Sequence, residues 1–202
     1  VGRKISDKVE IRIIKISDEP IADWDESLLL PVGEIGEITV KGVIVTREYY
    51  ERPDANEKAK IREGRYVWHR MGDVGYFDEE GRLWFCGRMV DRIVLKDTEL
   101  YTDQCENIFN THAQVKRSAL IGVGDKRKLS PTIVIQLHDK ELLKDAVALS
   151  RIEKELLELA GDFDLTSKIG KVFFKECFPV DVRHNAKIKR EILTIWAAGL
   201  LK

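Results

Sequence analysis

The chain has 202 residues, of which 44% are hydrophobic and 34% are charged, a composition that excludes an intrinsically disordered or fibrous protein. Its 34 basic residues nearly balance its 35 acidic residues, so no net field would draw it to nucleic acid or to an anionic membrane.

The three cysteines, Cys86, Cys105 and Cys177, are an odd number at wide spacing. This pattern argues against a disulfide framework and against a zinc site, and it favours a reducing compartment. No apolar run approaches the roughly twenty residues of a membrane-spanning helix, and the N-terminus lacks the pattern of a signal peptide. We therefore expect a cytoplasmic protein with no membrane span and no metal held by its own side chains.

The first ninety residues have mainly the pattern of strands. Alternation over 9–16 predicts a half-buried strand that begins almost at once, so we expect a preceding body of protein to be missing. Residues 17–36 indicate a polar loop in which the leucines at 28–30 are buried. A short strand follows over 36–42, and the charged stretch 55–63 is typical of a solvated helical turn.

Two glycine-flanked polar residues stand out in the next stretch. A strand pattern over 65–70 leads to Asp73, which follows a Met-Gly pair, and Arg88 follows Gly87 at the end of an aromatic strand. The turn-forming residues 77–81 lie between them, so we expect a hairpin that returns Asp73 and Arg88 to the same end. A carboxylate can accept hydrogen bonds from both hydroxyls of a vicinal diol, and a guanidinium suits a phosphate. His69 has no nucleophile in view, and we assign it no role.

The phrases R-M-G-D and W-F-C-G-R, which end at Asp73 and Arg88, resemble the (Y/R)-T-G-D and G-R pair of the adenylate-forming superfamily. That superfamily includes acyl-CoA synthetases, fatty acyl-AMP ligases and nonribosomal-peptide adenylation domains. The resemblance implies that Asp73 binds the ribose hydroxyls of ATP. It also implies that Arg88 makes a contact near the ribose and the α-phosphate.

The composition changes after Arg88, where helices and strands begin to alternate. The resemblance implies a hinge at 88–91 about which a small C-terminal domain swings. We therefore expect an α+β protein in which residues 1–88 form the β-rich end of a large domain and residues 89–202 form a small mobile α+β domain.

The segment after the hinge departs from the family's pattern, which is G-R-x-D-D-x-I-K-x-x-G-x-R-I. Here Val90 replaces the first Asp, Val94 the Lys, Asp97 the Gly and Glu99 the Arg. Loss of the Gly removes easy access to positive φ, and Glu in place of Arg inverts a charge. In the family this loop opens the face on which thioesters form, so its alteration argues against CoA as a cofactor.

The remaining elements are predicted from capping residues and periodicity. They are a helix from an N-cap at Thr102 through Phe109, strands over 115–123 and 132–137, a helix in two pieces over 139–160, and a strand over 172–174.

The stretch K-I-K-R-E-I-L, residues 187–193, fits the family's final G-K-I-x-R-x-x-L. Taken alone it indicates the basic start of a helix. The resemblance implies that Lys187 is the catalytic lysine that contacts the α-phosphate and the carboxylate during adenylation. An ammonium on a flexible stem can follow the charge that develops there.

R-H-N-A-K in place of T-x-x-G-K, with the terminal I-W-A-A, is similar to one branch in particular, the β-lactone synthetases of bacterial olefin biosynthesis. Its members activate a 2-alkyl-3-hydroxy fatty acid with ATP and Mg²⁺, and the substrate's own hydroxyl displaces AMP. The resemblance thus implies a fatty-acid substrate. The sequence has no Ser/Thr/Gly-rich phosphate loop, so we expect the missing N-terminal portion of the same protein as a partner and an inactive isolated fragment.

Two other interpretations stay open. In one, the full-length protein is a fatty acyl-CoA synthetase or a fatty acyl-AMP ligase, distinguished by a requirement for CoA or for a 3-hydroxyl on the substrate. In the other, the chain is a non-catalytic module that docks a partner, and Lys187→Ala would leave the activity of the full-length protein intact.

Overall fold

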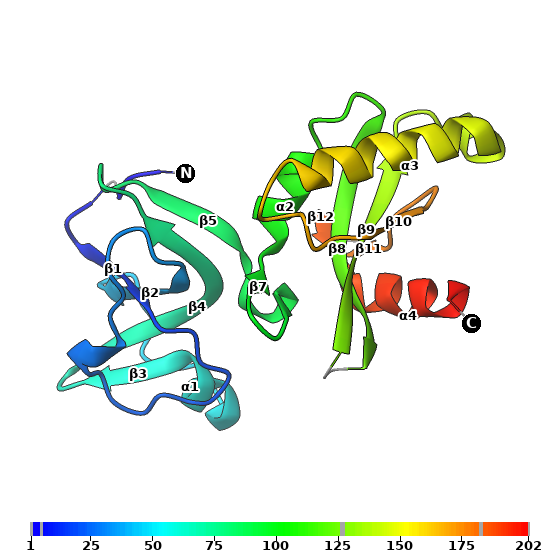
Figure 1. Ribbon diagram of the computed structural model, residues 1–202. Coiled ribbons are helices and arrows are strands. Elements are labelled where there is room, and N and C mark those ends of the chain that lie inside the picture. Colours follow the sequence, from blue (N-terminus) through cyan, green and yellow to red (C-terminus); the bar gives the residue numbers. More distant parts are fainter. Residues whose placement is uncertain (1, 5, 126–127, 182–183, 202) are drawn as a thin grey trace. The chain divides into compact units, whose positions relative to one another are not determined.

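The computed structural model describes residues 2–4, 6–125, 128–181 and 184–201 (Figure 1). The chain divides into two compact units, Val1–Val90 and Asp91–Lys202, which we call the first and the second unit. The division falls within the predicted hinge range of 88–91, and movement about that hinge stays a prediction.

The first unit is built on one antiparallel sheet in the order β1-β2-β4-β3, with β5 also paired to β4. β3 pairs with the first part of β4 and β5 with its last part, so the long strand β4 joins both. The elements are β1 (Val9–Ile14), the 3-10 turn η1 (Glu26–Leu28), β2 (Gly36–Gly42), α1 (Pro53–Ala59), β3 (Lys60–Glu63), β4 (Tyr66–Phe77) and β5 (Leu83–Arg88).

The core of the first unit is small and aromatic. Ile14, Ile61 and Trp68 are buried in it, and Trp24 stacks on Trp68 with the ring centroids 4.3 Å apart. The leucines at 28–30 were expected to be buried, but they are only half-buried. They lie on a loop along the edge of β1, so one side of each faces solvent.

The charged stretch 55–63 is only partly the solvated helical turn predicted for it. α1 ends at Ala59, and Lys60–Glu63 forms β3, because Ile61 is buried against the core and fixes the strand's alternation. The Lys60 side chain is buried too, on the opposite face of the strand, and its Nζ donates to the backbone oxygen of Thr46 at 2.5 Å. Burial lowers the pKa of Lys60.

The second unit contains a three-stranded sheet in the order β10-β9-β8 and two short hairpins. The 3-10 turn η2 (Met89–Asp91) crosses the division between the units. The other elements are β6 (Ile93–Val94), β7 (Glu99–Leu100), α2 (Thr102–Phe109), β8 (Val115–Asp125), β9 (Lys128–Leu137), η3 (Lys140–Lys144), α3 (Ala146–Gly161), β10 (Lys171–Phe174), β11 (Val180–Asp181), β12 (His184–Ile188) and α4 (Arg190–Leu200).

Helices cover both faces of this sheet, with α2 and α3 on one side and α4 on the other (Figure 1). Alternate residues of a strand point to opposite faces, so Leu120 of β8 packs in the core under α2 and α3, whereas Ala119 and Ile121 pack in the core under α4. Leu193 and Ala197, one helical turn apart, are the buried residues of α4.

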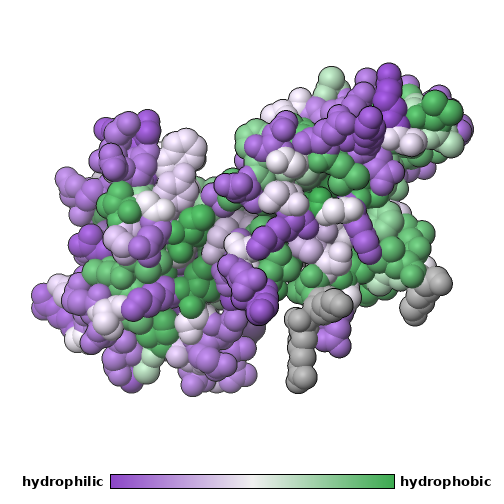
Figure 2. Space-filling model, in the orientation of Figure 1, coloured by the Kyte–Doolittle hydropathy of each residue, from purple (hydrophilic) through white to green (hydrophobic). Residues whose placement is uncertain are grey.

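The surfaces of α3 and α4 differ in character (Figure 2). The outer face of α3 is hydrophilic, and Lys154 and Glu158 form an i,i+4 ion pair on it. Over α4 the surface is largely hydrophobic, where Ile195 is 74% exposed. None of the helices that the structure describes combines the length and the apolar character needed to cross a bilayer.

The predicted α+β class is confirmed, as are the strands over 115–123, 132–137 and 172–174 and the helix in two pieces over 139–160. One detail was wrong. Thr102 is the first residue of α2, and the N-cap position belongs to Tyr101.

Candidate functional site

Asp73 and Arg88 lie directly opposite each other on β4 and β5. They are register partners, and Nη1 of Arg88 donates to Oδ1 of Asp73 at 2.6 Å. The same nitrogen lies 3.3 Å from the backbone oxygen of Met71. The Asp73 side chain is 22% exposed and that of Arg88 is 55% exposed. The predicted hairpin, with both residues at one end of it, is confirmed, and their roles in binding stay predictions.

β4 is irregular where it forms this site. Thr39 of β2 pairs with Arg70 of β4, and Glu37 of β2 pairs with Val74 of β4. Between these two pairs β4 has residues 71–73, whereas β2 has only residue 38. Residues 71–73 are therefore displaced from regular pairing with β2, although Asp73 still pairs with Arg88 of β5. Such bulges re-aim side chains, and here the bulge carries the candidate carboxylate.

Gly72 lies inside this bulge with φ of +66°, a conformation that favours glycine. A Cβ at this position would lie 3.4 Å from Nη2 of Arg88, because the guanidinium rests against the glycine. That is an ordinary van der Waals distance, so the backbone conformation, and not the space beside Arg88, favours glycine at position 72.

The pair fits a ligand that carries both a diol and a negative charge. Oδ1 of Asp73 holds Arg88, and no residue that the structure describes donates a hydrogen bond to Oδ2. An ionised carboxylate is an acceptor only, so this oxygen can receive hydroxyl donors. The guanidinium has five donors, and its half-exposed position leaves it able to bind an anion as well.

Lys187 lies in the second unit, near the end of β12, and its side chain is exposed. The interpretation of this stretch as the start of a helix was wrong for Lys187, because β12 continues to Ile188 and α4 begins at Arg190. Of the preceding R-H-N-A, Arg183 lies outside the described residues, as do the side chains at 184–186. An approach of Lys187 to Asp73 stays a prediction.

Arg190, the first residue of α4, is held in a part-buried network that sequence reasoning missed. Its Nη1 lies 2.5 Å from Oε1 of Glu106 on α2 and 3.2 Å from the backbone oxygen of Leu120. Burial raises the pKa of Glu106, and the neighbouring guanidinium opposes that shift. Arg190 also lies 3.6 Å from Asp91. This network fixes the start of α4, and with it the end of the strand that carries Lys187.

The segment that departs from the family's pattern forms the short hairpin β6–β7. Glu99, which stands where the family has Arg, accepts from Nε of Arg92 at 3.2 Å and from the hydroxyl of Tyr101 at 2.8 Å. Val90 is 77% exposed and Val94 is 48% exposed. Glu99 is thus accommodated in an ion pair within the second unit, where the family has a basic residue.

His69 has the surroundings of a structural histidine. Its Nδ1 lies 3.1 Å from the backbone oxygen of Ala59, and its Nε2 lies 3.5 Å from the hydroxyl of Tyr49. Burial lowers its pKa, so the ring favours the neutral form. Nothing in this geometry gives it a chemical role.

No protein-family model matches the chain. Two curated relatives are both named olefin β-lactone synthetase. The one from Xanthomonas campestris is 46% identical over 94% of this chain and 34% of its own length. The one from Stenotrophomonas maltophilia is 44% identical over 96% of this chain and 35% of its own length. The chain therefore spans about a third of the length of these relatives.

Solved structures give the same picture of the fold. The amide bond synthetase McbA of Marinactinospora thermotolerans is 26% identical and superposes with a TM-score of 0.75 over 97% of this chain and 36% of its own. The O-succinylbenzoate CoA synthetase of Bacillus subtilis, solved in complex with AMP, is 26% identical with a TM-score of 0.70 over 93% of this chain and 34% of its own.

Proposed function

We propose that the chain is a C-terminal portion of an adenylate-forming enzyme. This enzyme activates a fatty acid as its acyl-AMP and closes a 3-hydroxy fatty acid to a β-lactone. The observation that carries this proposal is the Asp73–Arg88 pair, set on a bulge in a chain that is 46% identical to an olefin β-lactone synthetase.

In this proposal Asp73 and Arg88 hold the nucleotide. Oδ2 of Asp73, to which no described residue donates, accepts from the ribose hydroxyls of ATP, and Arg88 contributes positive charge beside them. The complex of the related B. subtilis synthetase with AMP supports an adenine nucleotide as the ligand. Mg²⁺ would accompany ATP as its counter-ion.

Lys187 supplies the catalytic charge. In adenylation an oxygen of the substrate carboxylate bonds to the α-phosphorus of ATP, and pyrophosphate leaves with the electrons of the broken P–O bond. Negative charge develops on the α-phosphoryl oxygens, and a mobile ammonium stabilises it. Two observations support this role. The Lys187 side chain is exposed, and Arg190, three residues further along the chain, is held by Glu106, so the backbone near Lys187 is anchored.

Lactone formation is favoured over transfer to CoA. The 3-hydroxyl oxygen of the substrate bonds to its own acyl carbon, AMP leaves with the electrons of the acyl–phosphate bond, and the hydroxyl proton goes to solvent. No second substrate is needed. The ion pair of Glu99 with Arg92, in the loop where the family has a basic residue at position 99, agrees with an enzyme that does not bind the phosphates of CoA there.

The test uses the full-length enzyme, ATP, Mg²⁺ and two fatty acids that differ only in the 3-hydroxyl. AMP release and the lactone are measured with and without CoA. We expect lactone and stoichiometric AMP from the hydroxy acid, with no effect of CoA. A thioester product from either acid would favour the CoA-ligase alternative over lactone formation. Absence of AMP with both acids, from a folded enzyme, would overturn the proposal as a whole.

A further inference from the structure

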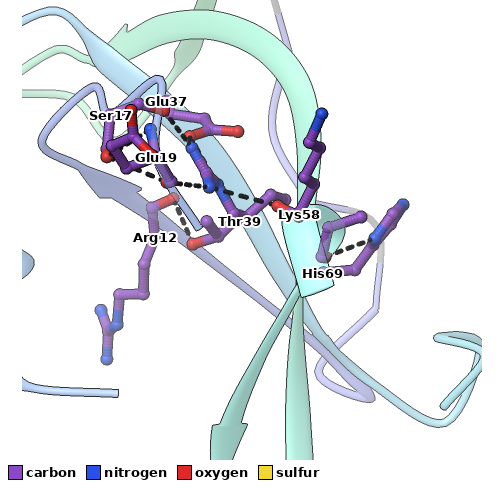
Figure 3. Close-up of polar contacts among 9 residues, drawn as sticks. Arg12, Ser17, Glu19, Glu37, Thr39, Lys58 and His69 are labelled. Atoms are coloured by element: carbon purple, nitrogen blue, oxygen red, sulfur yellow. Dashed lines mark hydrogen bonds and ion pairs between the residues drawn. The ribbon is translucent and has the colours of Figure 1, made fainter. Parts of the chain in front are cut away.

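Arg70, on β4 shortly before the bulge, uses its whole guanidinium group in hydrogen bonds. Figure 3 shows Ser17, Glu19, Glu37 and Lys58 gathered around one guanidinium. Nε and Nη2 donate to Oε2 of Glu37 at 2.9 and 2.7 Å. The remaining bonds go to backbone oxygens, from Nη1 to Glu19 and Lys58 at 3.0 and 3.2 Å and from Nη2 to Ser17 at 2.5 Å.

This ion pair is removed from solvent. The Arg70 side chain is 5% exposed and the Glu37 side chain is 1% exposed. A buried charge is costly to hold unless it is paired and hydrogen-bonded, so a sheet that needed only stability would do as well with apolar residues here. What a buried pair adds is a fixed geometry, because a guanidinium tolerates few orientations of its partners.

The position of the pair shows which geometry it fixes. Arg70 is the β4 residue at one end of the bulge, opposite Thr39, and Glu37 lies opposite Val74 at the other end. The ion pair therefore ties the two ends of the bulge together across the strands. Residues 71–73 lie between these fixed ends, and the Asp73 carboxylate is among them.

We propose that Arg70 and Glu37 form a brace that positions Asp73 for nucleotide binding, so that Arg70 is a positioning residue for the reaction. This rests on the proposed function. Without the brace, the bulge can shift along β2, and a displacement of about 1 Å at a binding group is enough to weaken it severely. The backbone bonds of Arg70 add the loop at 17–19 and the end of α1 to the same support.

The test is steady-state kinetics of the full-length enzyme carrying Arg70→Met, with ATP and the fatty acid varied in turn. We expect the KM for ATP to rise about tenfold, with a smaller change in kcat and in the KM for the acid. If Arg70→Met does not fold, Glu37→Gln removes only the charge of the brace and should raise the KM for ATP in the same direction. Arg70→Lys keeps the charge but has only three donors, so its KM for ATP should remain above that of the unaltered enzyme.

Thr39→Val is the matched control. Thr39 is buried opposite Arg70, but its hydroxyl donates to the backbone oxygen of Arg12 on β1 and takes no part in the ion pair. Its replacement costs a buried hydrogen bond and should lower the melting temperature without changing the KM for ATP. If the KM for ATP rises in both variants in proportion to the fall in melting temperature, Arg70 has a structural role only.

A second arm asks whether the effect passes through Asp73. In an Asp73→Ala background, Arg70→Met should raise the KM for ATP no further, because the group it positions is gone. Additive effects would overturn the brace. If Asp73→Ala alone leaves the KM for ATP unchanged, the proposed role of Asp73 fails instead, and the two failures are thereby distinguished.

Discussion

The guanidinium of Arg88 lies against Gly72, with Nη2 3.4 Å from where a Cβ would lie, an ordinary van der Waals distance. Gly72 itself has φ of +66°. The glycine of the M-G-D phrase thus meets the requirement for a left-handed backbone in the bulge that holds Asp73 beside Arg88.

Gly72→Ala tests the importance of the bulge when it is compared with Gly81→Ala. Gly81, in the hairpin turn, has a similar φ of +70°, and no atom lies within 4 Å of its Cβ position. Both variants should lose about 1–2 kcal/mol of unfolding free energy through backbone strain. Only Gly72→Ala should raise the KM for ATP of the full-length enzyme, because only it strains the bulge that carries Asp73. Equal kinetics for the two variants would contradict the arrangement.

Asp73→Ala should weaken ATP binding more than it slows chemistry. It removes hydrogen bonds to a charged group, each worth about 1.5–3 kcal/mol, so we expect the Kd for ATP to rise roughly 10- to 100-fold. Titration calorimetry of the full-length enzyme measures this directly. Asp73→Asn keeps one carbonyl acceptor but loses the charge that holds Arg88, and its Kd should lie between those of Asp73→Ala and the unaltered protein.

The hairpin at this site could be predicted because its signals are local. Turn residues, aromatic strand residues and two glycines all lie within a short stretch, and Asp73 and Arg88 are indeed opposite each other. The bulge had no comparable signal. It leaves the alternation of buried residues intact, since Arg70 and Val74 are both buried, so the pattern reads as a regular strand.

The two buried ion pairs were beyond the sequence for a different reason. Arg70 and Glu37 lie on strands that meet only in the folded sheet, and Arg190 and Glu106 come from helices far apart in the chain. A lone charged residue in a strand or at a helix start usually lies in solvent. Only the fold shows that Arg70, Glu37 and Glu106 are buried, that Arg190 is mostly shielded from solvent, and that each of them is paired. Lys60 was misread for the same reason, as a solvated charge.

Acid should loosen the β4–β5 hairpin through Asp78. Partial burial acts to raise the pKa of Asp78, but hydrogen bonds from the indole of Trp84 and from the amide and guanidinium of Arg82 outweigh it and hold the pKa well below its ordinary value of 3.8. The folded pKa is depressed, so this contribution to stability is present above about pH 4 and is lost as the pH falls further.

Asp78→Asn tests this by thermal unfolding as a function of pH. The variant should unfold at a lower temperature than the unaltered chain at neutral pH, and the gap should narrow as the pH falls below 3.8. Glu79→Gln is the control, because Glu79 is an exposed carboxylate in the same turn. A gap that stays constant with pH would show that the charge of Asp78 does not contribute.

Lys187→Ala should abolish most of the adenylation rate of the full-length enzyme while leaving its fold intact. The side chain is exposed, so its loss should change the unfolding free energy by no more than about 0.5 kcal/mol. A positioned charge at the developing phosphoryl charge is worth about 10²- to 10³-fold in kcat, and we expect a loss of that size in pyrophosphate exchange.

Lys171→Ala provides the matched control, since Lys171 is another exposed lysine on a short strand of the same unit. If both variants keep full exchange activity, the second unit acts by docking a partner and not by catalysis. If both lose it equally, the effect belongs to the surface charge of the unit and not to Lys187.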